Sequence, residues 1–196
     1  MLIPKIFLFL AALSNLTGYT IYFRLILKNQ IKPHAITNLV WSILLGLNCL
    51  IQIHSGVGLG SLLLATNFLG CFLIFLSCYL KGYINYDKID WLCFFLAIIA
   101  IILWLITKTP IYSIVLSCVI DFLALLPSFR KSFKKPWEDS PLAFFLSGTE
   151  YVLSFPSYQV ISFITLLYPV WVVFIDYSYA VMMLIRRWRI KALTNN

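Results

Sequence analysis

The amino-acid sequence contains seven long apolar segments separated by short polar stretches. They cover residues 6–23, 36–54, 58–80, 90–107, 110–128, 141–157 and 158–185. A helix needs about 20 apolar residues to cross about 30 Å of hydrocarbon. The pattern therefore predicts an all-α integral membrane protein with seven transmembrane helices. Of the 196 residues, 62% are hydrophobic and 11% are charged, a balance that no water-soluble core of this size accommodates.

The number of helices depends on two short separators, at 108–110 and at 156–157, because merging or splitting helices there gives six or eight. The first segment, preceded by Lys5, also has some features of a signal peptide. Seven helices place thirteen of the 15 Lys and Arg residues on one side and only Lys5 and Lys108 on the other. The positive-inside rule assigns the basic side to the cytoplasm. We therefore expect a multi-pass inner-membrane protein with its N-terminus outside the cytoplasm and its C-terminus inside.

An internal repeat appears when the sequence is shifted by 103 residues, which aligns 21–41 with 124–144 without a gap. The alignment matches Lys28 with Lys131, Lys32 with Lys135, Pro33 with Pro136, Thr37 with Ser140, and Leu39 with Leu142. Both copies join two helices in the same orientation, which predicts a parallel repeat. The expected plan is a three-helix repeat at 6–80, a linking helix at 90–107, a second three-helix repeat at 110–185 and a basic cytoplasmic tail at 186–196.

The stretch Asp-Phe-Leu-Ala-Leu-Leu-Pro-Ser-Phe-Arg-Lys at 121–131, followed by Lys135-Pro136 and Ser140-Pro141-Leu142, resembles a degenerate PQ-loop. The chain thus resembles the PQ-loop and SWEET superfamily of small transporters, which are built from parallel repeats. The Pro-Gln pair itself is absent, because Ser128 follows Pro127 and the first repeat has Arg24-Leu25 at the equivalent place. The resemblance implies the arrangement of three, one and three helices. It also implies transport of a sugar, an amino acid or a similar polar solute by alternating access between the two repeats.

Three acidic residues, Asp121, Glu150 and Asp176, lie inside predicted transmembrane segments. A charge at the centre of a bilayer costs about 2.5–3.5 kcal/mol on insertion scales, so each should face the interior or carry a proton. Serines recur at helical spacing beside two of these acids, as Ser113 and Ser117 before Asp121 and as Ser147 and Ser154 around Glu150. We predict that the three acids line a cavity or couple transport to protons. The alternative role for such polar groups is hydrogen bonding between helices.

Further polar and aromatic residues inside the segments are candidates for lining a substrate path. They are Asn15, Tyr19, Trp41, Asn48, Asn67, Trp104, Ser117 and Tyr168. Trp and Tyr also anchor helices at membrane interfaces, so this set has a second interpretation. Pro127 and Pro169 are predicted hinges, because a proline inside a helix removes one backbone hydrogen bond.

Other classes of function find little support in the sequence. The net charge of +8 lies at helix ends rather than in a nucleic-acid-binding pattern. The five cysteines lie in apolar segments without metal-ligand spacing, and His34 and His54 stand apart, so we expect no metal and no cofactor. The Gly-x-Gly-Asp motif of intramembrane aspartyl proteases is absent, which argues against an enzyme. A receptor or scaffold that does not transport stays open as the alternative function. The expected partners are a small-molecule substrate and the lipid bilayer, and a homo-oligomer also stays open.

Overall fold

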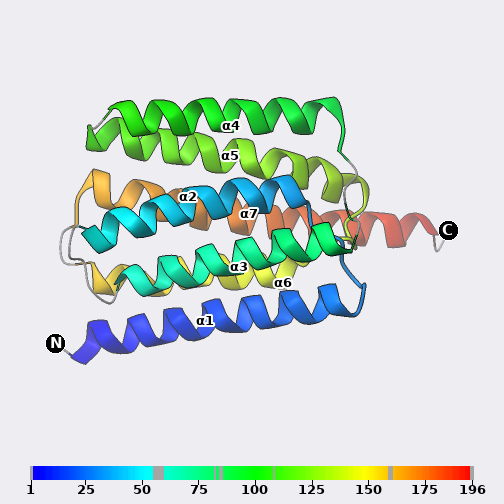
Figure 1. Ribbon diagram of the computed structural model, residues 1–196. Coiled ribbons are helices and arrows are strands. Elements are labelled where there is room, and N and C mark those ends of the chain that lie inside the picture. Colours follow the sequence, from blue (N-terminus) through cyan, green and yellow to red (C-terminus); the bar gives the residue numbers. More distant parts are fainter. Residues whose placement is uncertain are drawn as a thin grey trace. The chain divides into compact units, whose positions relative to one another are not determined.

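The computed structural model describes residues 2–54, 60–81, 83, 86–107, 109–158 and 161–194. These residues form helices and no strand, as Figure 1 shows, which confirms the predicted all-α class. The elements are α1 (Leu2–Leu27), α2 (Ala35–His54), α3 (Gly60–Leu80), α4 (Lys88–Thr107), α5 (Pro110–Lys134), α6 (Pro141–Ser154), the 3-10 turn η1 (Phe155–Ser157) and α7 (Phe163–Thr194).

Five stretches in the described part of the chain are long and apolar enough to cross a membrane. They are Pro4–Leu27, Leu63–Leu80, Lys88–Thr107, Ile111–Lys134 and Leu166–Leu193. The apolar part of α2, Ala35–Leu50, is shorter. Helix α6 has 14 residues and is therefore about 21 Å long, less than the thickness of the hydrocarbon layer. The chain thus has the helices of a membrane protein, while the count of seven complete spans stays a prediction.

Apolar side chains also cover the outer faces of the helices. Phe9 is 67% exposed, Ile106 69% and Phe174 65%, and many Leu and Ile residues on the same helices are similarly exposed. Soluble monomers rarely expose contiguous apolar patches larger than a few hundred Å². A hydrocarbon solvent accounts for this surface, because lipid tails cover it without the penalty that water imposes.

Several helix ends differ from the predicted segments: α1 spans Leu2–Leu27 instead of 6–23, and α6 ends at Ser154 instead of 157. Helix α5 continues past residue 128 to Lys134, and α7 begins at Phe163 instead of 158 and runs to Thr194. The segment predicted as a tail is therefore helical through residue 194. Apolar character marks where a segment leaves the hydrocarbon, but a helix has no need to end there. Arg and Lys are good helix formers, so α5 and α7 extend beyond their apolar parts.

The helices form two compact units. Unit 1 contains residues 1–32 and 129–196, and unit 2 contains Pro33–Ser128. In unit 1, α6 packs against both α1 and α7. These units do not coincide with the predicted repeats, because the first helix of each repeat belongs with the second and third helices of the other.

Unit 2 is held together by an apolar core in which α2, α4 and α5 meet. The core residues are Ile36, Val40, Leu44, Ala97, Ala100, Ile101, Ile120 and Ala124. Helix α2 also packs against α3. Three of the core residues are alanines, which let the helix backbones approach closely, as is usual for helices that associate in lipid.

A buried carboxylate closes one end of unit 1. Asp139, which is 2% exposed, accepts hydrogen bonds from the hydroxyls of Tyr22 at 2.7 Å and Tyr179 at 2.9 Å, and from the backbone N–H of Ser140 at 2.8 Å. The Tyr179 hydroxyl also shares a hydrogen bond of 2.7 Å with Ser132. Asp139 therefore joins α1, the end of α5 and α7 to the start of α6.

Two glycines allow close packing around α6. A Cβ atom at Gly148 would lie 2.6 Å from Cε1 of Tyr177, so only glycine fits there without a shift of the ring. A Cβ atom at Gly18 would lie 3.4 Å from Cβ of Leu146, at ordinary van der Waals distance. Beside it, the hydroxyl of Ser14 donates to the backbone oxygen of Leu146 at 2.8 Å. Helix α6 thus packs closely against α1 at Gly18 and against α7 at Gly148.

The Asp139 cluster generates a first prediction. Tyr22→Phe and Tyr179→Phe each remove one donor to a buried carboxylate, and hydrogen bonds to charged groups contribute about 1.5–3 kcal/mol. Each variant should lower the free energy of unfolding by roughly that amount in thermal or denaturant unfolding of the detergent-purified protein. Tyr79→Phe, at a position 61% exposed on α3, is the matched control and should change little. Equal losses in all three variants would contradict the proposed role of Asp139.

Candidate functional site

Two polar side chains predicted separately meet inside unit 1. Nδ2 of Asn15 on α1 donates to Oε2 of Glu150 on α6 at 2.7 Å, and each residue is 3% exposed. Asn15 lies near the middle of α1, and Glu150 lies in the second half of α6. The pair joins residues 135 positions apart in the sequence. This buried amide and carboxyl pair is the centre of the candidate site.

A stripe of small and polar residues on α1 builds one wall of this site. Ala11, Ser14, Asn15, Gly18 and Tyr22 are all buried and recur at helical spacing. The remaining faces of α1 are apolar and largely exposed, as suits lipid. The buried stripe differs from the exposed faces of α1 because it combines small side chains with groups that form hydrogen bonds.

Polar and aromatic groups continue from Glu150 toward η1. The hydroxyl of Ser154 donates to the backbone oxygen of Tyr151 at 2.7 Å and shares a hydrogen bond of 3.3 Å with the hydroxyl of Tyr158. Tyr168 of α7, a predicted lining residue, packs edge-on against Tyr151 with ring centroids 6.5 Å apart. Unit 1 therefore combines a buried carboxyl with hydroxyl and aromatic groups, which are the groups that bind small polar solutes.

The other predicted residues of unit 1 lie on α1 and α7. Asp176 is buried on α7, and the adjacent Tyr177 shares a hydrogen bond of 3.0 Å with Thr149. Tyr19 is half-buried on α1, and Pro169 is buried within α7, which is helical on both sides of it. Asp176 thus belongs to the same unit as Glu150, on a helix that packs against α6.

Asn15 and Glu150 belong to unit 1, whereas the remaining predicted residues belong to unit 2. They are Trp41, Asn48, Asn67, Trp104, Ser117, Asp121 and Pro127. Asn48 and Asn67 donate to backbone oxygens four residues earlier, at 2.9 Å and 3.1 Å, and Ser117 does the same at 2.9 Å. Local bonds of this kind satisfy a polar side chain within its own helix. Asp121 is buried on α5, one turn after Ser117.

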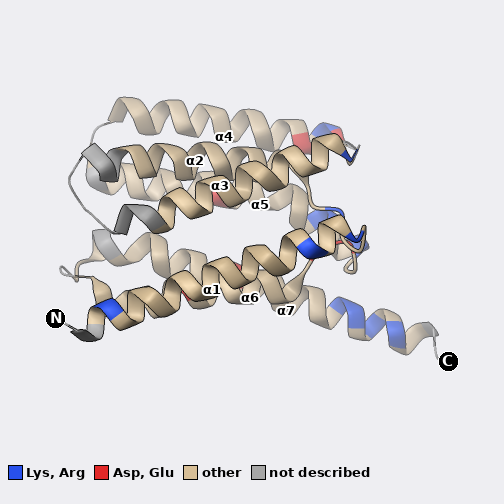
Figure 2. Cartoon of the chain, turned by 60° about the horizontal axis from the view of Figure 1, so that its bottom comes forward, with Lys and Arg blue, Asp and Glu red and all other residues tan. Residues whose placement is uncertain are grey.

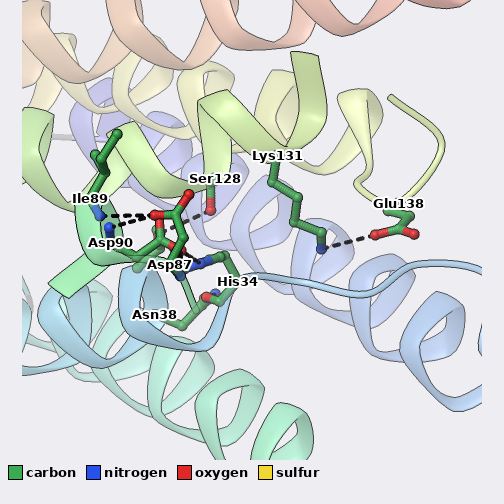
Figure 3. Close-up of polar contacts among 9 residues, drawn as sticks. His34, Asn38, Asp87, Ile89, Asp90, Ser128, Lys131 and Glu138 are labelled. Atoms are coloured by element: carbon green, nitrogen blue, oxygen red, sulfur yellow. Dashed lines mark hydrogen bonds and ion pairs between the residues drawn. The ribbon is translucent and has the colours of Figure 1, made fainter. Parts of the chain in front are cut away.

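Sequence reasoning missed a buried polar cluster in unit 2, which Figure 3 shows. Nε2 of His34 lies 3.3 Å from Oδ2 of Asp90, and both residues are buried. Asn38 donates to the backbone oxygen of His34 at 2.9 Å. Ser128 of α5 donates to the hydroxyl of Thr37 at 2.9 Å, which extends the cluster from α2 to α5.

In the sequence, His34 lies in the polar separator before an apolar segment, and Asp90 is the first residue of the segment 90–107. The available signal was the spacing of Asp87 and Asp90. Oδ1 of Asp87 accepts hydrogen bonds from the backbone N–H groups of Ile89 and Asp90, each at 3.0 Å. A capping residue does the same at the start of a helix. Once Asp87 caps α4, Asp90 is left to face the interior.

The geometry of the Asn15 and Glu150 pair suits both protonation states of a carboxyl. The Asn15 N–H can donate to a carboxylate oxygen and equally to the carbonyl oxygen of a protonated carboxyl. The hydrogen bond therefore survives in both protonation states of Glu150. Among the described residues, no three or more His, Cys, Asp or Glu side chains gather in a way that could hold a metal ion.

Comparisons with known proteins add no constraint to this site. No protein-family model, no curated protein and no solved structure matches the chain. The likeness to PQ-loop and SWEET transporters therefore rests on the sequence motifs and the helix pattern, and the roles of the residues rest on the geometry described above.

Proposed function

We propose that the protein is a multi-pass membrane transporter of a small polar solute, such as a sugar or an amino acid, coupled to protons through Glu150. The observation that carries the proposal is the buried carboxyl of Glu150, bonded by the amide of Asn15 inside apolar helices. A glutamine would serve packing as well without the cost of a charge, whereas a carboxyl can carry a proton. The proposed orientation has the basic helix ends in the cytoplasm.

The proton has a simple task in this proposal. An ionised Glu150 makes the change of access between the two sides unfavourable, because a buried charge in a low-dielectric surrounding is costly. Protonation removes that charge while Asn15 keeps its hydrogen bond. The solute then binds among the neighbouring hydroxyl and aromatic groups, and the neutral, loaded protein changes its access from one side to the other.

The moving bodies in this proposal are the two compact units rather than the two sequence repeats. Ser14 and Asn15 bond α1 to α6, which belongs to the other repeat. The chain passes between units at residues 32–33 and 128–129, the second directly after Pro127. Ser128 bonds to Thr37 in unit 2, whereas Ser132, one turn later, bonds to Tyr179 in unit 1. Pro127 is therefore the proposed hinge in α5.

Transport is tested in proteoliposomes that contain a pH-sensitive dye. Individual sugars and amino acids are added, and we expect at least one to cause acidification of the interior. Glu150→Gln should keep the hydrogen bond to Asn15 and the fold but reduce solute-dependent proton entry at least tenfold, because an amide does not titrate. Glu138→Gln is the matched control, since Glu138 is the other glutamate of the chain and lies in the loop before α6.

Two results would contradict the proposed function. Equal proton entry in the Glu150→Gln variant and the wild type would exclude Glu150 as the proton carrier. Solutes that raise the unfolding temperature of the purified protein without any flux would favour the receptor alternative.

The proposed moving bodies are tested with a disulfide between α1 and α6. Gly18→Cys and Leu146→Cys place two Cβ atoms about as far apart as a disulfide requires, given the 3.4 Å separation. In a background whose five native cysteines are replaced by alanine, oxidation should leave transport unchanged, because both cysteines lie in unit 1. If oxidation stops transport and a reductant restores it, the three-helix repeats are the moving bodies instead.

A further inference from the structure

The basic residues at one end of the helices are divided unequally between the units. The basic end of unit 1 has eleven Lys and Arg residues and two acids, Glu138 and Asp139, so the net charge of this end is +9. Unit 2 has Lys81 and Lys88 with Asp87 and Asp90, so its net charge is zero. The positive-inside rule requires basic residues on one face and is satisfied by any division between units. Unit 1 contains three of the four basic stretches, at the ends of α1, α5 and α7, so most of the basic charge belongs to it.

Two arginines near the end of α7 are held in place by backbone oxygens and an aromatic ring. Arg187 donates to the backbone oxygens of Pro136 at 2.9 Å and Asp139 at 2.7 Å. Arg186 donates to the backbone oxygen of Phe133 at 2.9 Å and stacks over its ring at 4.3 Å. Carbonyl oxygens and a ring orient a guanidinium without neutralising it. Arg186 is therefore an oriented positive group at the end of α7, while the charge of Arg187 also interacts with the carboxylate of Asp139.

The last turns of α7 combine this charge with an exposed tryptophan. Trp188 is 72% exposed and lies between Arg187 and the exposed Arg189, with Lys191 also exposed nearby. Figure 2 shows Lys and Arg along this part of α7 and at the C-terminal end of α1, where Arg24 and Lys28 are exposed. Tryptophan prefers the level of the lipid headgroups, because its ring is apolar and its N–H donates a hydrogen bond.

We propose that the basic end of unit 1, formed by the exposed Arg24, Lys28, Lys134, Arg189 and Lys191 with Trp188, binds anionic phospholipid headgroups. Lys and Arg donate charge-assisted hydrogen bonds to phosphate oxygens, and Arg does so with two donors at once. Trp188 sets the depth of this surface at the headgroup level. The proposal depends on charge, exposure and the membrane location of the helices. It does not depend on transport.

The test compares lipids added to the protein purified in a neutral detergent. Phosphatidylglycerol should raise the unfolding temperature by several degrees, whereas phosphatidylcholine or inorganic phosphate should not. The combined variant Arg189→Gln, Lys191→Gln and Trp188→Ala should lose at least half of this rise, because these exposed side chains contribute to binding rather than to the core. Sodium chloride at high concentration should weaken the effect in the wild type.

The matched control is the variant Lys81→Gln and Lys88→Gln, which removes the lysine after α3 and the lysine that begins α4, both in unit 2, and should keep the full rise. Binding is also measured directly, as the amount of spin-labelled phosphatidylglycerol held at the protein surface relative to phosphatidylcholine. Equal rises with both lipids would overturn the proposal. So would an equal rise with inorganic phosphate, or equal lipid binding in the wild type and the α7 variant.

Discussion

The structure depends on pairing every polar group that enters an apolar surrounding, and Asp139 shows this constraint most directly. The interior of the protein supplies no water to satisfy a carboxylate, so an unpaired one there would be costly. Tyr22, Tyr179 and the backbone of Ser140 meet that demand from different parts of the chain. Unit 2 solves the same problem around His34, Asp90 and Thr37. Each unit is thus closed at one end by a buried polar cluster.

The two clusters lie at equivalent places but use different chemistry. Pro33 and Pro136, aligned by the 103-residue shift, are both fully buried, and each precedes a cluster. In unit 2 the hydroxyl of Thr37 accepts from Ser128, whereas in unit 1 the aligned Ser140 caps α6. What the shift matches is a buried turn followed by a hydroxyl at the start of a helix. The partners differ, so the units are free to take different tasks, as their unequal basic charge suggests.

Helix existence could be predicted from the sequence, because apolar length is a direct physical requirement for crossing hydrocarbon. Helix ends could not, since α7 continues through Arg186 and Lys191 after its apolar part is complete. Asn15 and Glu150 were each identified as candidates, but their contact was not. Faces toward lipid and faces toward neighbouring helices are both apolar, so one sequence does not indicate which helices pack together. Asp90 stands at the start of an apolar segment and Asp139 in a polar separator, positions that do not indicate burial, yet both side chains are buried.

Helix α1 is joined to α6 and to the residue before it by a series of hydrogen bonds inside unit 1. Three contacts follow one another along α6: Tyr22 with Asp139 before its start, Ser14 with Leu146 in its first half, and Asn15 with Glu150 in its second half. Helix α6 is too short to be fixed by lipid at both ends, so these contacts fix it. In the proposed mechanism, a proton on Glu150 changes the charge at one of these contacts and leaves the other two unchanged. The proposed proton step therefore does not require unit 1 to come apart.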